Sequence, residues 1–186
     1  RFQRAGYQMI LSDFEIEQER MIEPFEHGKK GSPSYGLSSY GYDIRLGEEF
    51  IEYTTNYPGD LDPRNPGAMR EGKHYSKRQT SDTLVLPAGG FVLGHSMEVL
   101  TMPHDVVAMV KDKSTYARLG VTVQNTVLEP GWTGQITLEI TNHNSRPVIL
   151  LVGEGIAQLM FWKGKPCMTP YGNGKYQDQT GAVLPR

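Results

Sequence analysis

The sequence predicts an all-β fold with one short helix near its N-terminus, and three observations support this prediction. Its 21 glycines and 12 prolines divide the chain into short segments. These segments are rich in β-branched and aromatic residues, which favour strands. Several alternate between apolar and polar residues or are apolar throughout, as half-buried and buried strands are. Many short strands joined by turns favour a sandwich, jelly roll or barrel.

The strand prediction rests on seven segments bounded by turn residues. Pro-Ala-Gly-Gly at 87–90 separates two of them and predicts a hairpin or a tight connection, and Pro130-Gly131 predicts another turn. The segments are TLVLP (83–87), FVLGHSMEVLTMP (91–103), DVVAMV (105–110), VTVQNTVL (121–128), QITLEIT (135–141), PVILLV (147–152) and IAQLMFW (156–162).

The N-terminal region carries a helix signal. Ser12 and Glu15 have the spacing of a capping box, which predicts the start of a short helix. Residues 1–8 precede Met9, which we expect to be the native start, so we interpret them as a remnant of cloning, with a natural extension as the alternative. A chain of 186 residues can bury roughly 70% of its unfolded surface, so we expect residues 9–186 to form a single domain.

Two polar stretches lack a strand pattern. Residues 54–82 are rich in Pro, Gly and Asn, which predicts a long excursion with little regular structure and a candidate contact with a neighbouring subunit. Residues 171–186 are too polar and too rich in glycine to form an independent core element. Such a tail is either disordered or held by a ligand or partner.

Charge and composition exclude several classes of function. A net charge of -2, with basic residues dispersed among acids, offers no basic face for polymeric nucleic acid. No apolar run approaches the roughly 18 residues of a membrane span, and the N-terminus lacks a secretory signal, so we expect a soluble, cytoplasmic protein. Motifs of serine hydrolases, P-loop proteins and dinucleotide-binding proteins are absent from the sequence.

The sequence also lacks the residues that a zinc site would need as ligands. Cys167 is the only cysteine, which excludes an internal disulfide and suits a reducing compartment, where it is best interpreted as a small apolar filler. Zinc-dependent nucleobase deaminases need a Pro-Cys-x-x-Cys element, which one cysteine cannot supply. The five histidines show no spacing typical of zinc ligands, so we predict no zinc site.

Two segments are candidates for chemistry. KSTYAR at 113–118 places two cations and two hydroxyl groups close together, so it suits phosphate oxygens or the polar edge of a base; a polar loop fits the same pattern. In 135–141, strict alternation places Ile136, Leu138 and Ile140 on one face and Glu139 on the other. Periodicity alone fits a solvent-facing glutamate as well as a catalytic one.

Five motifs extend along the chain: SYGLSSYGYDIRLG (34–47), KSTYARLG (113–120), LEPGWTGQITLE (128–139), GEGIAQLMF (153–161) and GKYQDQTGAVLP (174–185). Together and in this order they resemble the dCTP deaminase family, which belongs to the trimeric dUTPase superfamily. The resemblance covers nearly all of residues 9–186 and implies a distorted jelly roll or β-barrel of the dUTPase-like (β-clip) type.

The resemblance implies hydrolytic deamination of dCTP to dUTP, without zinc, by a glutamate. Glu139 matches the family's catalytic glutamate, which takes a proton from water and later delivers protons to the ring and to the leaving ammonia. Ser114 and Arg118 match residues that accompany it around the base and the water. The other implied nucleotide-binding residues are Lys113, Thr115, Tyr116, Ala117, Glu129 near the deoxyribose, Thr137 and Leu138 through their backbone, Gln158, Tyr171, Lys175 and Gln179.

The resemblance also implies partners and a moving part. A tail at about 170–186 would fold over the triphosphate as a lid, and Mg²⁺ would be held mainly by the triphosphate itself, without a dedicated protein site. The implied assembly is a homotrimer with active sites between subunits. The implied feedback inhibitor is dTTP, which would bind the same pocket.

Three departures from the family pattern leave the exact substrate and reaction open. Asp112 replaces a small residue before KSTYAR, Asn125-Thr126-Val127 differs before the LEPGW motif, and the tail is two residues shorter between Tyr171 and Lys175. These changes are compatible with a deaminase for a monophosphate or a 5-substituted cytosine nucleotide. The KSTYAR form resembles the deamination-only branch of the family. The alternatives are a bifunctional enzyme that also cleaves dUTP, a pure dUTPase, against which the retained Glu139 argues, and a catalytically silent nucleotide-binding regulator.

Overall fold

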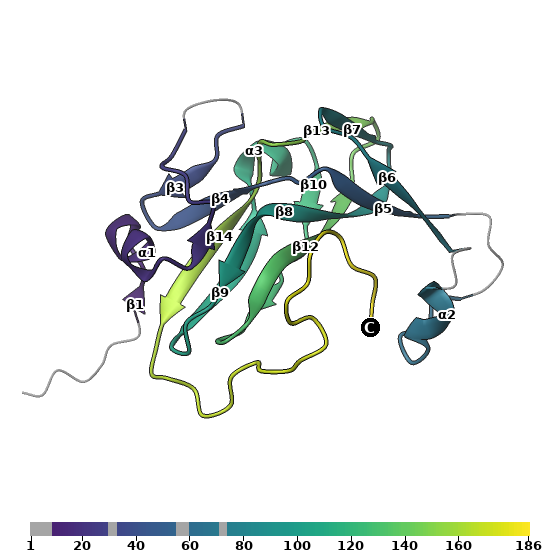
Figure 1. Cartoon of the computed structure of the whole chain (residues 1–186). Helices are drawn as coiled ribbons and strands as arrows, with labels where there is room; N and C mark the ends of the chain where they lie inside the picture. Colours follow the sequence, from purple (N-terminus) through teal and green to yellow (C-terminus); the bar gives the residue numbers. More distant parts are fainter. Residues whose placement is uncertain (1–8, 30–32, 55–59, 71–73) are drawn as a thin grey trace, which may run out of the picture.

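The computed structural model describes residues 9–29, 33–54, 60–70 and 74–186. Within these ranges the predicted all-β fold with a short N-terminal helix is confirmed: two antiparallel sheets pack face to face, and three short helices lie at their margins (Figure 1). The segment before residue 9, interpreted above as a cloning remnant, lies outside the described residues. No helix within the described ranges has the length and apolarity needed to cross a membrane.

The first sheet has the order β11-β9-β14-β4-β3, and β1 also pairs with β14. The second has the order β10-β12-β8-β5-β6, and β2 also pairs with β8. A separate two-stranded ribbon joins β7 and β13.

The strands of the first sheet are β1 (Met9–Ile10), β3 (Gly36–Ser38), β4 (Gly41–Arg45), β9 (Val106–Asp112), β11 (Val127–Leu128) and β14 (Gly155–Lys163). Those of the second sheet are β2 (Ile22–Glu23), β5 (Glu49–Tyr53), β6 (Tyr75–Gln79), β8 (Phe91–Thr101), β10 (Val121–Val123) and β12 (Thr133–Asn142). The ribbon consists of β7 (Thr83–Leu86) and β13 (Val148–Leu151), and the helices are α1 (Asp13–Glu19), α2 (Pro66–Arg70) and α3 (Ser114–Ala117).

All seven predicted strand segments form strands, with two differences in pairing. The segment 121–128 divides into β10 and β11, which join different sheets because residues 124–126 leave the extended strand between them. The connection at 87–90 is tight, with the amide of Gly90 donating to the carbonyl of Pro87 at 2.9 Å. It does not form a hairpin, because β7 pairs with β13 and not with β8.

The prediction of little regular structure between residues 54 and 82 is partly wrong. The described part of this excursion contains the short helix α2 and the strand β6, which pairs with β5 along its whole length. β6 reads YSKRQ and forms an exposed edge of its sheet. It has no apolar alternation because neither of its faces is buried in the core, so its sequence carries no strand pattern.

The N-terminal helix begins where the capping box predicted. The amide and the hydroxyl of Ser12 both donate to the carboxylate of Glu15, at 2.9 and 2.8 Å. Ile16, in the middle of this helix, is fully buried in the core between the sheets. The helix is therefore anchored by one apolar residue and by its N-terminal hydrogen bonds.

Alternate side chains of β12 face the core and the opposite side of its sheet. Ile136, Leu138 and Ile140 are buried among the residues of the main core, as the alternation predicted. A β-bulge between Gln135 and Thr137 shifts the pairing of β12 with β8. There the amide of Ile136 donates to the buried hydroxyl of Ser96 at 2.8 Å, so a side chain satisfies an amide that the irregular ladder leaves without a strand partner.

A buried ion pair crosses the interior between the sheets. The carboxylate of Glu98 is fully buried and accepts from Arg45 twice, from Nε at 2.8 Å and from the backbone amide at 3.0 Å. Burial raises the pKa of Glu98, and the contacts with Arg45 oppose this rise. The pair joins β4 of the first sheet to β8 of the second.

Removing one partner of this ion pair should reduce the stability of the protein more than replacing both partners. Glu98→Ala removes the carboxylate that accepts from the buried Arg45 guanidinium and leaves it only the longer contact with Glu26, at 3.6 Å, so we expect it to reduce the free energy of unfolding by about 3 kcal/mol. The double variant Arg45→Met with Glu98→Met replaces both charges by apolar groups and should lose less. Urea unfolding of both variants measures the difference. A double variant less stable than the single one would contradict this account.

Candidate active site

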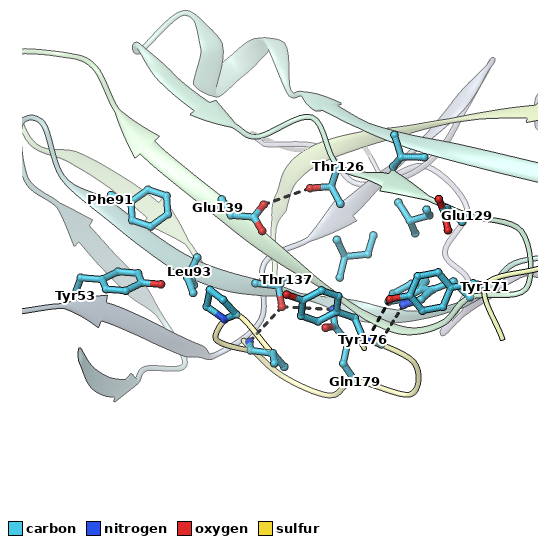
Figure 2. A pocket seen from close by; sticks show the side chains of 16 residues that line it. Tyr53, Phe91, Leu93, Thr126, Glu129, Thr137, Glu139, Tyr171, Tyr176 and Gln179 are labelled. Carbon is cyan, nitrogen blue, oxygen red and sulfur yellow. Dashed lines mark hydrogen bonds between the residues drawn. The ribbon is translucent and has the colours of Figure 1, made fainter. Parts of the chain in front are cut away.

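A cavity of about 590 Å³ surrounds Glu139 on the face of the second sheet opposite the main core (Figure 2). Three strands of that sheet, the segment 126–129 and the C-terminal tail form its walls. Lining residues are Tyr53, Phe91, Leu93, Thr126, Val127, Leu128, Glu129, Trp132, Ile136, Thr137, Glu139, Tyr171, Tyr176, Gln179, Val183 and Pro185.

The alternation of β12 places Glu139 in this cavity. Its cross-strand partner on β8 is Leu93, which projects to the same side of the sheet. Beside them Tyr53 and Phe91 form an aromatic pair, with ring centroids 5.9 Å apart. Figure 2 shows this apolar wall on one side of the carboxylate. A planar heterocycle fits a cavity with such a wall and a carboxyl group.

The surroundings of Glu139 shift its protonation. Burial raises the pKa of this carboxyl group, while hydrogen bonds from its own backbone amide and from the Thr126 hydroxyl lower it in part. Burial, together with the nearby charge of Glu139, raises the pKa of Tyr53, so this phenol stays protonated at neutral pH. A carboxyl group with a raised pKa in a cavity is suited to general acid and base chemistry.

The C-terminal tail closes one side of the cavity. Figure 1 shows it, in yellow, returning along the second sheet and ending beside α2. The indole Nε1 of Trp132 donates to the carbonyl of Tyr176 at 2.9 Å, and the amide of Gln135 donates to the carbonyl of Gln179 at 2.9 Å. Leu184 is buried in a small second apolar cluster of this sheet. The tail is thus held by its own chain.

Two predicted nucleotide contacts, Gln179 on the tail and Thr137 on β12, already have hydrogen-bond partners in the chain. The side-chain amide of Gln179 donates to the carbonyl of Gln135 at 2.7 Å. The hydroxyl of Thr137 accepts from the amide of Val183 at 3.2 Å and from the side chain of Gln179 at 3.4 Å. Gln179 therefore anchors the tail to β12 in this structure.

A second group of predicted residues lies around a separate cavity of about 410 Å³, lined by residues 28–29, 34–38 and 43. The ammonium of Lys113 is paired with the carboxylate of Asp43 and donates to the hydroxyl of Ser34 at 3.1 Å. Gln158, on β14, pairs with Asp43 across the strands, and its side chain reaches Ser38 at 3.5 Å. Neither Lys113 nor Gln158 lines the cavity around Glu139.

Helix α3 presents the rest of the KSTYAR segment. Ser114, Thr115, Ala117 and Arg118 are exposed, and the Arg118 guanidinium donates to the carbonyl of Ser114 at 3.2 Å. Tyr116 is instead buried in the core, where its hydroxyl accepts from the amide of Leu151 at 3.0 Å. Its position gives it a structural role.

The structure therefore brings together only some of the predicted site residues. Around one cavity lie Glu129, Thr137, Glu139, Tyr171 and Gln179. Leu138 projects into the core, which agrees with a contact made only by its backbone. Outside that cavity lie the segment 113–118, Gln158 and the exposed side chain of Lys175.

The structure shows where each of the three departures from the family pattern lies and which groups some of these residues contact. The carboxylate of Asp112 accepts from the amide of Val123 at 2.7 Å and so ties β9 to β10. In the segment 125–127, Thr126 and Val127 line the cavity. In the shortened tail, the amide of Gly174 donates to the carbonyl of Tyr171 at 3.2 Å, so a compact turn connects Tyr171 to Lys175.

Five aromatic or polar residues of the cavity had no role assigned from the sequence. Aromatic residues at strand ends and in a polar tail were the available signal for four of them, but such residues more often pack in cores. For the fifth, the signal was its place in a segment that departs from the family pattern. The five are Tyr53, Phe91, Trp132, Tyr176 and Thr126.

Metal ligands do not gather anywhere in the described part of the chain, where no group of three or more His, Cys, Asp or Glu side chains could hold an ion. The fold and the cavity together are typical of a β protein that binds a small molecule beside a carboxyl group, here that of Glu139. This class still includes proteins with many different substrates.

Comparison with known proteins identifies the family. A dCTP deaminase-like family model matches residues 10–164. The chain is 44% identical over 178 residues to a dCTP deaminase of Campylobacter fetus, covering 91% of both chains, and 41% identical over 179 residues to one of Marinobacter nauticus, covering 91% of this chain and 93% of the relative. The chain belongs to the dCTP deaminase family, whose members are enzymes.

The solved structure of another protein has a similar fold. The dCTP deaminase from Agrobacterium tumefaciens superposes with a TM-score of 0.64 at 22% identity, over 84% of this chain. The match spans about half of that protein, 49% of its length. At this identity the likeness supports the dUTPase-like fold and not the details of the site.

The raised pKa of Glu139 predicts an effect on stability. Because the pKa lies above its ordinary value of 4.5, the folded state binds this proton more tightly, and the resulting stability is present below about pH 4.5 and lost as pH rises through the folded pKa. Glu139→Gln cannot ionise. We expect its Tm to exceed that of the wild type by about 2 °C at pH 8, with the difference closing near pH 4.

Scanning calorimetry across this pH range measures the difference. The matched control Glu48→Gln changes an exposed side chain and should leave the Tm unaltered. A Glu139→Gln protein that is less stable than the wild type at pH 8 would contradict the assigned burial effect.

Proposed function

We propose that this protein hydrolyses dCTP to dUTP and ammonia and so supplies dUTP for thymidylate synthesis. The single observation that supports this most strongly is Glu139, a partly buried carboxyl group with a raised pKa at the wall of a cavity that suits a pyrimidine. The relatives named dCTP deaminase support the choice of substrate. We also propose that the enzyme acts in the cytoplasm.

The proposed reaction needs one group that accepts and then releases protons. The Glu139 carboxylate takes a proton from water as the water oxygen attacks C4 of cytosine and the proton is delivered to N3. The second proton of the added water then passes through Glu139 to the amino group, the C4–N bond breaks, and ammonia leaves. A carboxyl group with a raised pKa suits both steps. No zinc is required in this scheme.

Several groups around the cavity would orient the nucleotide. The backbone at Thr137 and Leu138 would bind the polar edge of the pyrimidine, and Glu129 would lie near the deoxyribose. The proposed lid comprises residues 170–186, with Tyr171 and Gln179 already at the cavity. Lys175 is exposed, so its ammonium would be available to a triphosphate when the lid closes. Closing the lid would exclude water other than the nucleophile.

The position of the KSTYAR segment supports an active site shared between copies of the chain. Ser114 and Arg118 would act next to Glu139, but neither lines its cavity. A neighbouring copy would bring them there. We therefore propose a homotrimer, in which one subunit supplies Glu139 and the next supplies Ser114 and Arg118, with Lys113, Thr115 and Gln158 near the phosphates. We propose that dTTP inhibits by binding the same pocket.

Magnesium fits this site as a companion of the nucleotide. The described residues contain no cluster of three metal ligands, and Asp43, the carboxylate near Lys113, is already paired with that ammonium. The ion would thus be held mainly by triphosphate oxygens, whose charge it would offset.

The apolar wall supports a second substrate class. Tyr53, Phe91 and Val127 would tolerate a substituent on C5 of the base, so a 5-substituted cytosine nucleotide is the second candidate. A bifunctional enzyme would also release dUMP and pyrophosphate, and a silent regulator would bind dCTP without turnover.

Product analysis tests the activity and Glu139 together. With dCTP and Mg²⁺, we expect stoichiometric dUTP and ammonia from the wild type, unaffected by a zinc chelator. Glu139→Gln should keep nucleotide affinity and lose at least about 10³-fold in kcat, because only the proton carrier is removed. The panel includes dCMP, CTP, 5-methyl-dCTP and dUTP. Wild-type rates in Glu139→Gln would overturn the mechanism, and binding without any product would support the regulator.

Mixing two inactive variants tests the shared site. If Glu139 and Arg118 come from different copies, co-expressed Glu139→Gln and Arg118→Ala chains should regain about one quarter of the wild-type activity, because each site needs one intact partner of each kind (one half times one half). Ser114→Ala mixed with Arg118→Ala is the matched control and should regain none. Absence of recovery in the first mixture would place both residues in one subunit.

A further inference from the structure

Thr126 contacts the carboxylate of Glu139 directly. Its hydroxyl donates to Oε2 of Glu139 at 3.3 Å, and Figure 2 shows the second carboxylate oxygen turned away from Thr126 towards the cavity. Of the described side chains, Thr126 is the one with a hydrogen bond to this carboxylate. It lies between β10 and β11, outside any strand.

The backbone around Thr126 is tied to two neighbouring strands. Its carbonyl accepts from the amide of Val110 on β9 at 2.9 Å, and the amide of Gln124 donates to the carbonyl of Glu139 on β12 at 3.0 Å. The loop therefore bridges the two sheets beside the cavity. With both sides fixed in this way, the hydroxyl is held in place before any ligand arrives.

We propose that Thr126 is a positioning residue for Glu139: its hydroxyl holds one carboxylate oxygen and leaves the other free to take a proton from water. This inference rests on the proposed function, because it concerns the proton carrier of that reaction. It assigns a role to a residue in the segment where this chain departs from its family. Thr126 itself need not touch the reacting atoms.

The charges around the cavity make this neutral donor important. The other titratable groups that line it are Tyr53 on β5, Glu129 before the Pro-Gly turn, and Tyr171 and Tyr176 on the tail, and β8 contributes only apolar side chains. None of these lining groups is a cation. Within one chain, the hydroxyl of Thr126 thus provides the side-chain stabilisation of the Glu139 anion, and it opposes the effect of burial on the pKa.

Two substitutions at position 126 distinguish the effect of the hydroxyl from the effect of the side-chain shape. Thr126→Val removes the donor and keeps the branched shape, and Thr126→Ser keeps the donor. The pKa of Glu139 is measured without substrate, from the ¹³C carboxyl resonance that disappears in Glu139→Gln. We expect this pKa to rise in the valine variant and to stay near the wild-type value in the serine variant.

The pH profile of dCTP turnover provides the second readout. Since Glu139 must be ionised to act as a base, the acid limb of kcat/KM should move to higher pH in Thr126→Val. On that limb kcat/KM should fall by about threefold to tenfold, the effect of one net hydrogen bond, and recover as pH rises. Thr126→Ser should retain the wild-type profile.

The outcomes separate this inference from the proposed function. An unchanged pKa in a Thr126→Val protein with wild-type thermal stability would overturn the inference, as would equal rises in the valine and serine variants. If the pKa rises in the valine variant alone but the acid limb stays in place, Thr126 stabilises the Glu139 anion as inferred, and Glu139 is not the catalytic base. A shift of both readouts in the valine variant alone supports the inference.

Discussion

The register between β12 and β8 is the constraint on which both the core and the cavity depend. β12 places Leu138 in the core and Glu139 in the cavity, so a slip by one residue would exchange the two faces and bury the carboxyl group among apolar side chains. The bulge at Ile136 interrupts the ladder within this strand. Ser96, fully buried, binds the amide of Ile136 and so keeps the bulge in place.

The same region connects the two groups of predicted nucleotide-binding residues. The hydroxyl of Ser96 donates to the carbonyl of Glu98 at 2.7 Å, and the carboxylate of Glu98 binds Arg45. Arg45 lies two residues after Asp43, which is paired with Lys113 beside the second cavity. Buried polar contacts therefore join the strand of Glu139 to the strand of Asp43, so the two groups are held in a fixed relation.

Sequence patterns predicted the strands from β7 to β14, because burial leaves a clear apolar signal in them. They missed β6, an exposed edge strand without such a signal, and also the shorter strands β1 to β5, although β4 is buried throughout. For Glu139, alternation predicted the face of the strand but not a role, and the catalytic role that we propose for it rests on the resemblance of five motifs. The tail contacts of Gln179 and the hydrogen bond of Thr126 were beyond prediction. Both depend on the tertiary placement of irregular segments, to which a local sequence pattern is insensitive.

The distribution of charge gives a physical reason for sharing an active site. A nucleoside triphosphate carries several negative charges, and the residues that line the Glu139 cavity include two carboxyl groups and no cation. Binding such an anion there with one chain alone would place like charges together. The cations of the KSTYAR segment lie outside the cavity, with Arg118 exposed. A neighbouring chain that presents Arg118 to this cavity would offset the charge and, by lowering the cost of ionising Glu139, would also favour its basic form.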